Sequence, residues 1–189
     1  MNMKAVILFL SICFFIKPAL PGVDRQEAQK AFVLLNNVRA NPAAFAAEMP
    51  FLAEITKKPL LVWNDTLAKV AEAKALDMAT RLYVGHVDPD GYGLNQKINE
   101  AGYKLNPKWL ASKELNYFES ISAGAADGET AIRNLLIDKN VPTLGHRKHL
   151  LGLDEWNASM ADIGIGYARP VANSPYKSYV CVIIARHSW

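Results

Sequence analysis

The chain has 189 residues, with 21 basic and 18 acidic side chains and a formal net charge of only +3. It contains no concentrated run of lysine or arginine interleaved with aromatic residues, so nucleic-acid binding is not expected. Hydrophobic residues make up 51% of the chain, and the length suits one domain with one sizeable core.

The N-terminus has the layout of a secretory signal peptide. A short basic start precedes twelve uncharged, mostly apolar residues, Ala5–Ile16, and a proline-containing break at residues 17–22. The apolar run fits the ~7–15 residues of signal peptides and is shorter than the ~20 needed to span a bilayer. We therefore expect residues 1–22 to be cleaved, the protein to be exported to a periplasm or out of the cell, and no transmembrane segment to remain.

The exported chain is expected to form one domain, residues 23–189. About 165 residues remain after cleavage, enough for a single core. They include only one cysteine, Cys181, so an internal disulfide cannot form and stability must come from the core. Because Cys181 lies in the apolar segment "YVCVIIA", we expect a buried structural thiol.

Helical periodicity dominates the first part of this domain. A helix is predicted from Asp24 to the Asn-Pro pair at residues 41–42, and a short second helix is predicted over residues 42–49. Asp65 or Thr66 is predicted to cap a long helix, whose apolar positions recur every three or four residues at Leu67, Ala71, Ala75, Met78 and Leu82. The glycine-rich segment "GHVDPDGYG", residues 85–93, is expected to be an ordered loop.

The second part of the domain changes from helices to strands. Residues 128–139 and 145–152 return to helical spacing, and Gly152 is placed to end the later helix. Residues 160–170 and 178–187 are rich in strand-forming residues and predict a hairpin of central strands. Helices followed by late strands predict a layered α+β domain.

Four histidines are candidates for chemistry: His86, His146, His149 and His187. A divalent metal site would use two or three of them with nearby carboxylates. His146 and His149 share one helix face, although the same spacing is more typical of two polar residues on a short helix. The alternative for His86 is a loop histidine bonded to local backbone, and His187 is expected in solvent. The chain has neither a serine-hydrolase elbow nor a zinc-peptidase helix motif.

The order of several motifs resembles the CAP superfamily, also called the SCP domain, which unites cysteine-rich secretory proteins, insect venom antigens and plant pathogenesis-related proteins. The resemblance covers about residues 30–186 and looks closest to bacterial members, which commonly lack disulfides. It implies an α-β-α sandwich with a central antiparallel sheet. The motifs are "LLNNVRANP", "LVWNDTLAKVAEAKALDMA", "GHVDPDGYG", "NYFESISAG", "GHRKHLLG" and the two final strand segments.

The resemblance also implies a cleft with two histidines and two acidic residues. His86 and His146 match the two family histidines. Position 149 is commonly asparagine in relatives, so His149 is expected to face elsewhere.

The acidic positions of the cleft fall on Glu119 and Asp138. The segment "FESI" matches the family's usual "GENI", with Phe118 in place of glycine and Ser120 in place of asparagine. Asp138 replaces a frequent glutamate, and its shorter side chain withdraws the carboxylate by about 1.5 Å, one C–C bond.

These four residues suit a divalent cation such as zinc, with His86 and His146 as the main ligands and Glu119 and Asp138 as weaker ones. No other cofactor is expected. Without a metal, the same groups would bond to one another in a structural network.

The resemblance implies a binding protein, because relatives are mostly secreted binding proteins, some for sterols or lipids and others for metals. We expect a non-enzymatic protein that binds a small apolar, lipid-like or sterol-like ligand or an envelope partner. One alternative is a metal-dependent hydrolase, a peptidase or esterase with Glu119 as base. The other is a structural or partner-binding module. The residues alone reveal no nucleophile, oxyanion hole or ordered base.

Overall fold

The structure, a computed structural model, describes residues 20–171 and 173–187. The signal peptide expected at residues 1–22 lies outside this part except for its last three residues, so it stays a prediction. Among the described residues, none of the helices is long and apolar enough to cross a membrane.

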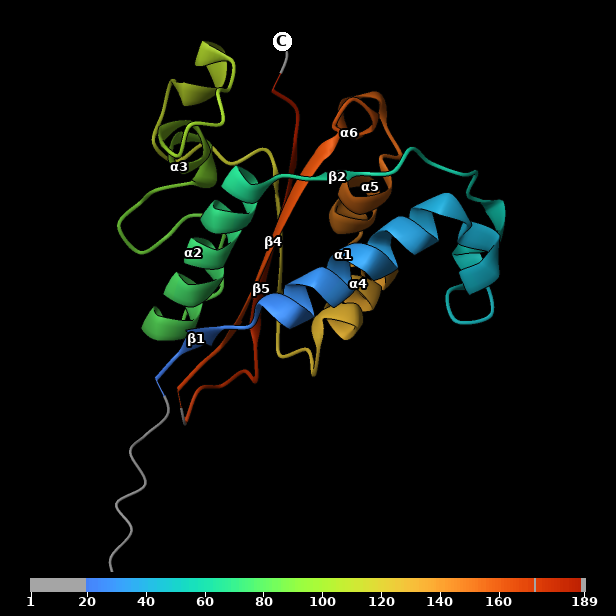
Figure 1. Cartoon of the computed structure of the whole chain (residues 1–189), viewed down its shortest axis with the longest axis horizontal. Helices are drawn as coiled ribbons and strands as arrows, with labels where there is room; N and C mark the ends of the chain where they lie inside the picture. Colours follow the sequence, from blue (N-terminus) through green and yellow to red (C-terminus); the bar gives the residue numbers. More distant parts are fainter. Residues whose placement is uncertain (1–19, 172, 188–189) are drawn as a thin grey trace, which may run out of the picture.

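A five-stranded sheet forms the middle layer of the domain (Figure 1). Its centre is the predicted antiparallel hairpin, made of β4 (Asp162–Arg169) and β5 (Tyr179–Ala185). β3 (Glu119–Ala123) pairs antiparallel with β5 and forms one edge of the sheet. On the other side of β4, β1 (Gly22–Val23) pairs antiparallel and β2 (Val62–Trp63) pairs parallel.

Helices cover both faces of this sheet (Figure 1). On one face, α2 (Asp65–Arg81) packs along β4 and β5 and contacts α3 (Leu94–Glu100). On the other face, α4 (Gly128–Ile137) contacts both α1 (Arg25–Ala40) and α5 (Gly145–Leu151). The central hairpin is buried along almost its whole length because it lies between these two layers. The predicted α-β-α sandwich is confirmed, and the short parallel β2 is the one exception to the antiparallel pairing among the described strands.

The ends of α2 differ from the prediction. Asn64, rather than Asp65 or Thr66, caps the helix, and its side chain accepts hydrogen bonds from the amides of Thr66 and Leu67 at 3.0 and 3.1 Å. Leu82 does not continue the apolar stripe, because it ends the helix in a left-handed conformation with φ of 55° and is 44% exposed.

The short helix predicted over residues 42–49 is wrong. The chain instead makes a 3-10 turn, η1 (Pro42–Phe45), and a second one, η2 (Pro50–Glu54). Met49 precedes a proline and is not helical, with φ of −133° and ψ of 83°, because the proline ring disfavours a helical conformation at that position. A third 3-10 turn, η3 (Pro107–Leu110), and the short helix α6 (Glu155–Ala158) complete the described elements.

The contact between α2 and β4 is a backbone-to-backbone contact. A Cβ atom at Gly164 would lie 2.2 Å from the backbone nitrogen of Ala68, and one at Gly166 would lie 2.2 Å from the carbonyl oxygen of Ala71. Only glycine leaves room for such a close approach. These two glycines therefore set the distance of α2, and of the loop that follows it, from the sheet.

Replacing Gly166 with alanine should lower the free energy of unfolding by about 1–3 kcal/mol or more, because the added methyl group would overlap the α2 backbone. Urea denaturation followed by circular dichroism measures this loss. Gly145→Ala is the matched control, since its new Cβ would meet only Thr143 Oγ1 at an ordinary 3.6 Å. Equal midpoints for the two variants would contradict the close contact.

Candidate functional site

A cavity of about 420 Å³ lies at the β3 edge of the sheet. Its walls come from the loop after α2, from β3, from α5 with the loop before it, and from α6. It therefore brings together segments of both helical layers. The lining residues are His86, Tyr117, Glu119, Ser120, Val141, Thr143, Gly145, His146, His149, Trp156 and Asn157.

Strand register directs Glu119 toward the α2 layer. Glu119 pairs with Ile183, which in turn pairs with Gly164, the glycine against α2. Residues directly opposite each other on neighbouring strands share a face of the sheet. The carboxylate therefore lies on the same side as the loop that carries His86.

Both oxygens of the Glu119 carboxylate are bonded. His86 Nδ1 lies 2.8 Å from Oε2, and Asn116 Nδ2 donates to the same oxygen at 2.6 Å. The Cys181 thiol donates to Oε1 at 3.4 Å. Burial raises the pKa of Cys181, so the thiol keeps the proton that it donates. The Glu119 side chain is 0% exposed, and the predicted structural thiol proves to be one of its partners.

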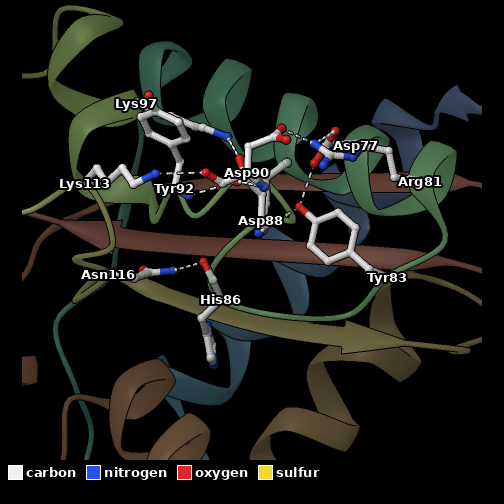
Figure 2. A network of polar contacts seen from close by, with 11 residues as sticks. Asp77, Arg81, Tyr83, His86, Asp88, Asp90, Tyr92, Lys97, Lys113 and Asn116 are labelled. Atoms are coloured by element: carbon white, nitrogen blue, oxygen red, sulfur yellow. Dashed lines mark hydrogen bonds and ion pairs between the residues drawn. The ribbon is translucent and has the colours of Figure 1, made fainter.

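The loop between α2 and α3 is held in place by Asp88. Its Oδ1 accepts hydrogen bonds from the amides of Asp90 and Tyr92, and its Oδ2 accepts one from the Lys97 ammonium group. Burial alone would raise the pKa of Asp88, but Lys97 and the two amides lower it to about 2. Figure 2 shows the imidazole of His86 pointing away from this network, so the network fixes the loop and leaves the ring at the cavity.

The second histidine–carboxylate pair comes from the other layer. Asp138 ends α4 in a left-handed conformation with φ of 53°, and its Oδ1 lies 2.7 Å from His146 Nδ1. Its Oδ2 accepts a hydrogen bond from the amide of Arg147 at 3.2 Å. The Asp138 side chain is 1% exposed. The short aspartate thus reaches His146, because the turn between α4 and α5 brings the carboxylate to the start of α5.

His149 does not face elsewhere as expected. It lines the cavity, is 7% exposed, and its Nδ1 lies 2.7 Å from Ser120 Oγ. Ser120 points to the opposite face of β3 from its neighbour Glu119 and so reaches α5. The family resemblance implies asparagine at both positions, 120 and 149. Ser120 and His149 both differ from this pattern, and the joint difference was a sequence signal that the two side chains contact each other.

Burial makes His149 a neutral imidazole. The pKa of His149 is lowered to about 4, chiefly by burial; the Ile184 backbone opposes this shift, and the nearby His146 and His86 add to it. Within the described part of the chain, Nε2 of His149 has no hydrogen bond of good geometry. A third, uncharged imidazole therefore belongs to the cavity wall.

The donor set fits a cation held by two imidazoles. His86 and His146 each use Nδ1 for a buried carboxylate, which leaves Nε2 as the nitrogen for a ligand. Metal-binding histidines commonly show this arrangement, in which the carboxylate fixes the tautomer and the ring orientation. No group of three or more His, Cys, Asp or Glu side chains in the described ranges is arranged to hold a metal ion. The remaining coordination positions would have to come from water or a ligand.

His187, expected in solvent, has a partner. Its side chain is 69% exposed, but its Nδ1 lies 2.6 Å from Oδ2 of Asp162. The same oxygen accepts a hydrogen bond from the Tyr103 hydroxyl. This group is not part of the cavity lining.

Comparison with known proteins identifies the fold. A model of the family described as "CAP: Cysteine-rich secretory protein family" matches residues 34–183. No curated protein sequence matches the chain. The match of the family model confirms the predicted family.

Two solved structures are similar in fold. One is an extracellular protein containing a SCP domain from Bacillus anthracis str. Ames, with a TM-score of 0.54, 22% identity, and coverage of 86% of this chain and 41% of that one. The other is an outer surface protein from Borrelia burgdorferi, with a TM-score of 0.55, 14% identity, and coverage of 88% of this chain and 99% of that one. This chain thus spans about two fifths of the Bacillus protein.

The buried His149 should make stability depend on pH. An ordinary histidine has a pKa of 6.5, whereas burial lowers that of His149 to about 4. Between these values the unfolded chain binds a proton that the folded protein does not, so stability falls as the pH drops from 6.5 toward 4. At ~1.4 kcal/mol per pKa unit, the loss is on the order of 3 kcal/mol.

The variant His149→Asn lacks this titration and should lose less stability between about pH 7 and about pH 4.5. Urea denaturation of both proteins at both pH values measures the difference, in which the contributions of all other groups cancel. An equal loss in the two proteins would rule out a depressed pKa at His149.

Proposed function

The chain belongs to the CAP, or cysteine-rich secretory protein, family, and on this premise we propose that it is an exported, non-enzymatic binding domain whose ligand occupies the cavity at the β3 edge. The observation that carries this proposal is the convergence of His86 and His146 on one cavity, each braced by a buried carboxylate. Residues 1–22 would be the signal and residues 23–189 the binding domain. The names of the two similar structures, an extracellular protein and an outer surface protein, support export to a periplasm or out of the cell.

A divalent cation such as zinc is part of this proposal. Nε2 of His86 and Nε2 of His146 would hold it, while Glu119 and Asp138 fix the tautomer and the orientation of the two rings through Nδ1. When bound, the cation would supply a Lewis acid that attracts an oxygen of the ligand. The protein's own contribution is to present the two nitrogens from opposite layers at a cavity that is open to solvent.

The composition of the cavity favours an envelope component over a wholly apolar ligand. Val141 is the one aliphatic side chain among the lining residues, and all the others except Gly145 carry polar or aromatic groups. A sterol or an acyl chain would find few apolar contacts there, because pockets for such ligands are lined predominantly by apolar side chains. The lipid-like ligand expected from the resemblance therefore has less support than an envelope partner.

The hydrolase alternative gains no support from the geometry. Its base would be Glu119, but this carboxylate is fully buried and both of its oxygens are bonded to protein groups. A general base must reach the proton that it removes. The structural alternative remains an outcome of the experiment below.

Isothermal titration calorimetry with zinc chloride tests the cation. We expect the wild-type protein to bind one zinc ion and the His86→Ala/His146→Ala double variant to bind none. The control is His187→Ala, which removes an exposed histidine outside the cavity and should leave zinc binding unchanged. If wild type and double variant both bind no zinc while His146→Ala lowers the melting temperature, the four residues are a structural network and the cation is excluded.

Glu119→Gln should weaken zinc binding by roughly 10–100-fold, the usual effect of removing a carboxylate behind a histidine ligand. Glutamine keeps the shape of the side chain but loses its charge, so Nδ1 of His86 is oriented less strongly. The same titration measures this change, with thermal melting as a check of folding. Unchanged zinc affinity in a folded Glu119→Gln protein would show that Glu119 does not tune the imidazole.

A further inference from the structure

We propose that the ligand of this cavity is a neutral saccharide, whose ring stacks on the aromatic wall while its hydroxyl groups bond to the polar side chains opposite. The inference rests on the proposed function, because it names the ligand class of the same cavity. The aromatic wall is defined by two lining residues, Tyr117 and Trp156.

Both residues of the aromatic wall remain accessible. Tyr117 is 45% exposed and Trp156 is 39% exposed, although most large hydrophobic side chains of the domain are buried. An exposed tyrosine and an exposed tryptophan on one cavity combine apolar ring surface with polar edges, which suits a ligand that is apolar on one side and polar on the other.

The aromatic wall is held rigid from behind by Phe118. Phe118 is 0% exposed, and its ring stacks with that of Trp156 at a centroid distance of 5.9 Å and meets that of Tyr117 edge-on at 6.4 Å. Trp109 packs edge-on against both Phe118 and Trp156, at 5.5 and 5.3 Å. The cluster is packed before any ligand arrives, so binding to it costs little ordering.

The remaining lining supplies neutral hydrogen-bonding groups. Thr143 and Asn157 carry donors and acceptors of the kind that match hydroxyl groups, and in the metal-free protein Nε2 of His86 and Nε2 of His146 add two further hydrogen-bonding atoms. The lining contains no lysine and no arginine, and its one carboxylate, that of Glu119, is already bonded on both oxygens. An anionic ligand such as a nucleotide would find no lysine or arginine in this lining and would depend on the proposed cation alone.

A sugar ring combines the properties that this cavity matches. One side of the ring presents C–H groups, which are attracted weakly to the negative face of an aromatic ring. Its rim carries hydroxyl groups that both donate and accept hydrogen bonds. The cavity volume of about 420 Å³ lies within the usual range of ligand pockets. A divalent cation at the two imidazoles would add one more contact to a hydroxyl oxygen.

The test is a titration of the zinc-loaded and the metal-free protein with three neutral trisaccharides: triacetylchitotriose, cellotriose and maltotriose. Binding is followed by chemical-shift changes in two-dimensional NMR spectra, which detect the millimolar affinities expected for short saccharides. Cytidine and hexanol serve as probes of simple stacking and of simple apolar binding. Pull-down on insoluble chitin and cellulose then separates a surface-attached glycan from a free oligosaccharide as the source of the ligand.

Three variants locate the site. Tyr117→Ala should weaken saccharide binding roughly tenfold, and Tyr117→Phe should retain most of it, because the ring is kept. The matched control is Tyr176→Ala, which removes a tyrosine of similar exposure, 42%, that packs edge-on against Tyr179 away from the cavity. Tyr117 is half exposed, so its loss should leave the fold intact, and thermal melting confirms this.

The outcomes distinguish this inference from the proposed function. Saccharide binding that falls in Tyr117→Ala and persists in Tyr117→Phe and Tyr176→Ala supports the inference. Zinc binding without any saccharide binding overturns the inference and leaves the proposed function standing. Saccharide binding that is indifferent to Tyr117→Ala, or binding of cytidine or hexanol alone, also overturns it.

Discussion

The close approach of α2 to the central hairpin is the constraint on which the candidate site depends. Gly164 and Gly166 let the helix backbone lie directly on β4, so α2 has little freedom to shift relative to the sheet. Its left-handed end at Leu82 then starts the loop that carries His86 to the β3 edge. Asp88 holds the loop through two amides and Lys97. Packing inside the domain therefore fixes a side chain at its surface.

Buried carboxylates complete the site on both sides of the sheet. Glu119 reaches His86 in the α2 layer, and Asp138 reaches His146 in the α4–α5 layer. A buried carboxylate is tolerated only when hydrogen bonds compensate for the loss of water. Here the imidazoles are among those partners, so the interactions that stabilise the carboxylates also orient the rings. The same hydrogen bonds therefore stabilise the fold and hold the imidazole rings in place for a ligand.

The sequence predicted the parts whose pattern repeats, and missed those that depend on single contacts. The hairpin of β4 and β5 was predicted because its two apolar runs are typical of strands buried between two layers. The helix α2 was predicted because its apolar residues recur at helical spacing. The cap at Asn64 was missed because three adjacent polar residues could each serve as a cap, and only the backbone conformation selects one.

The candidate site was predicted only in part. The motifs of the family resemblance placed His86, Glu119, Asp138 and His146, and the structure brings them together in two pairs. The contact of His149 with Ser120 was missed because a family pattern describes each position separately and not a pair that changes together. The aromatic wall was missed because the segments around Tyr117 and Trp156 have no periodicity, so only tertiary packing places them on one cavity.

The position of the two histidines in different helical layers has a mechanical consequence. A ligand or cation that contacts both would tie the loop after α2 to the start of α5, around β3, which among the described strands pairs with β5 alone. Such a tie would hold the β3 border of the sheet closed. Since binding to the folded state alone stabilises it by mass action, opening of this border and release of the ligand would be a single event.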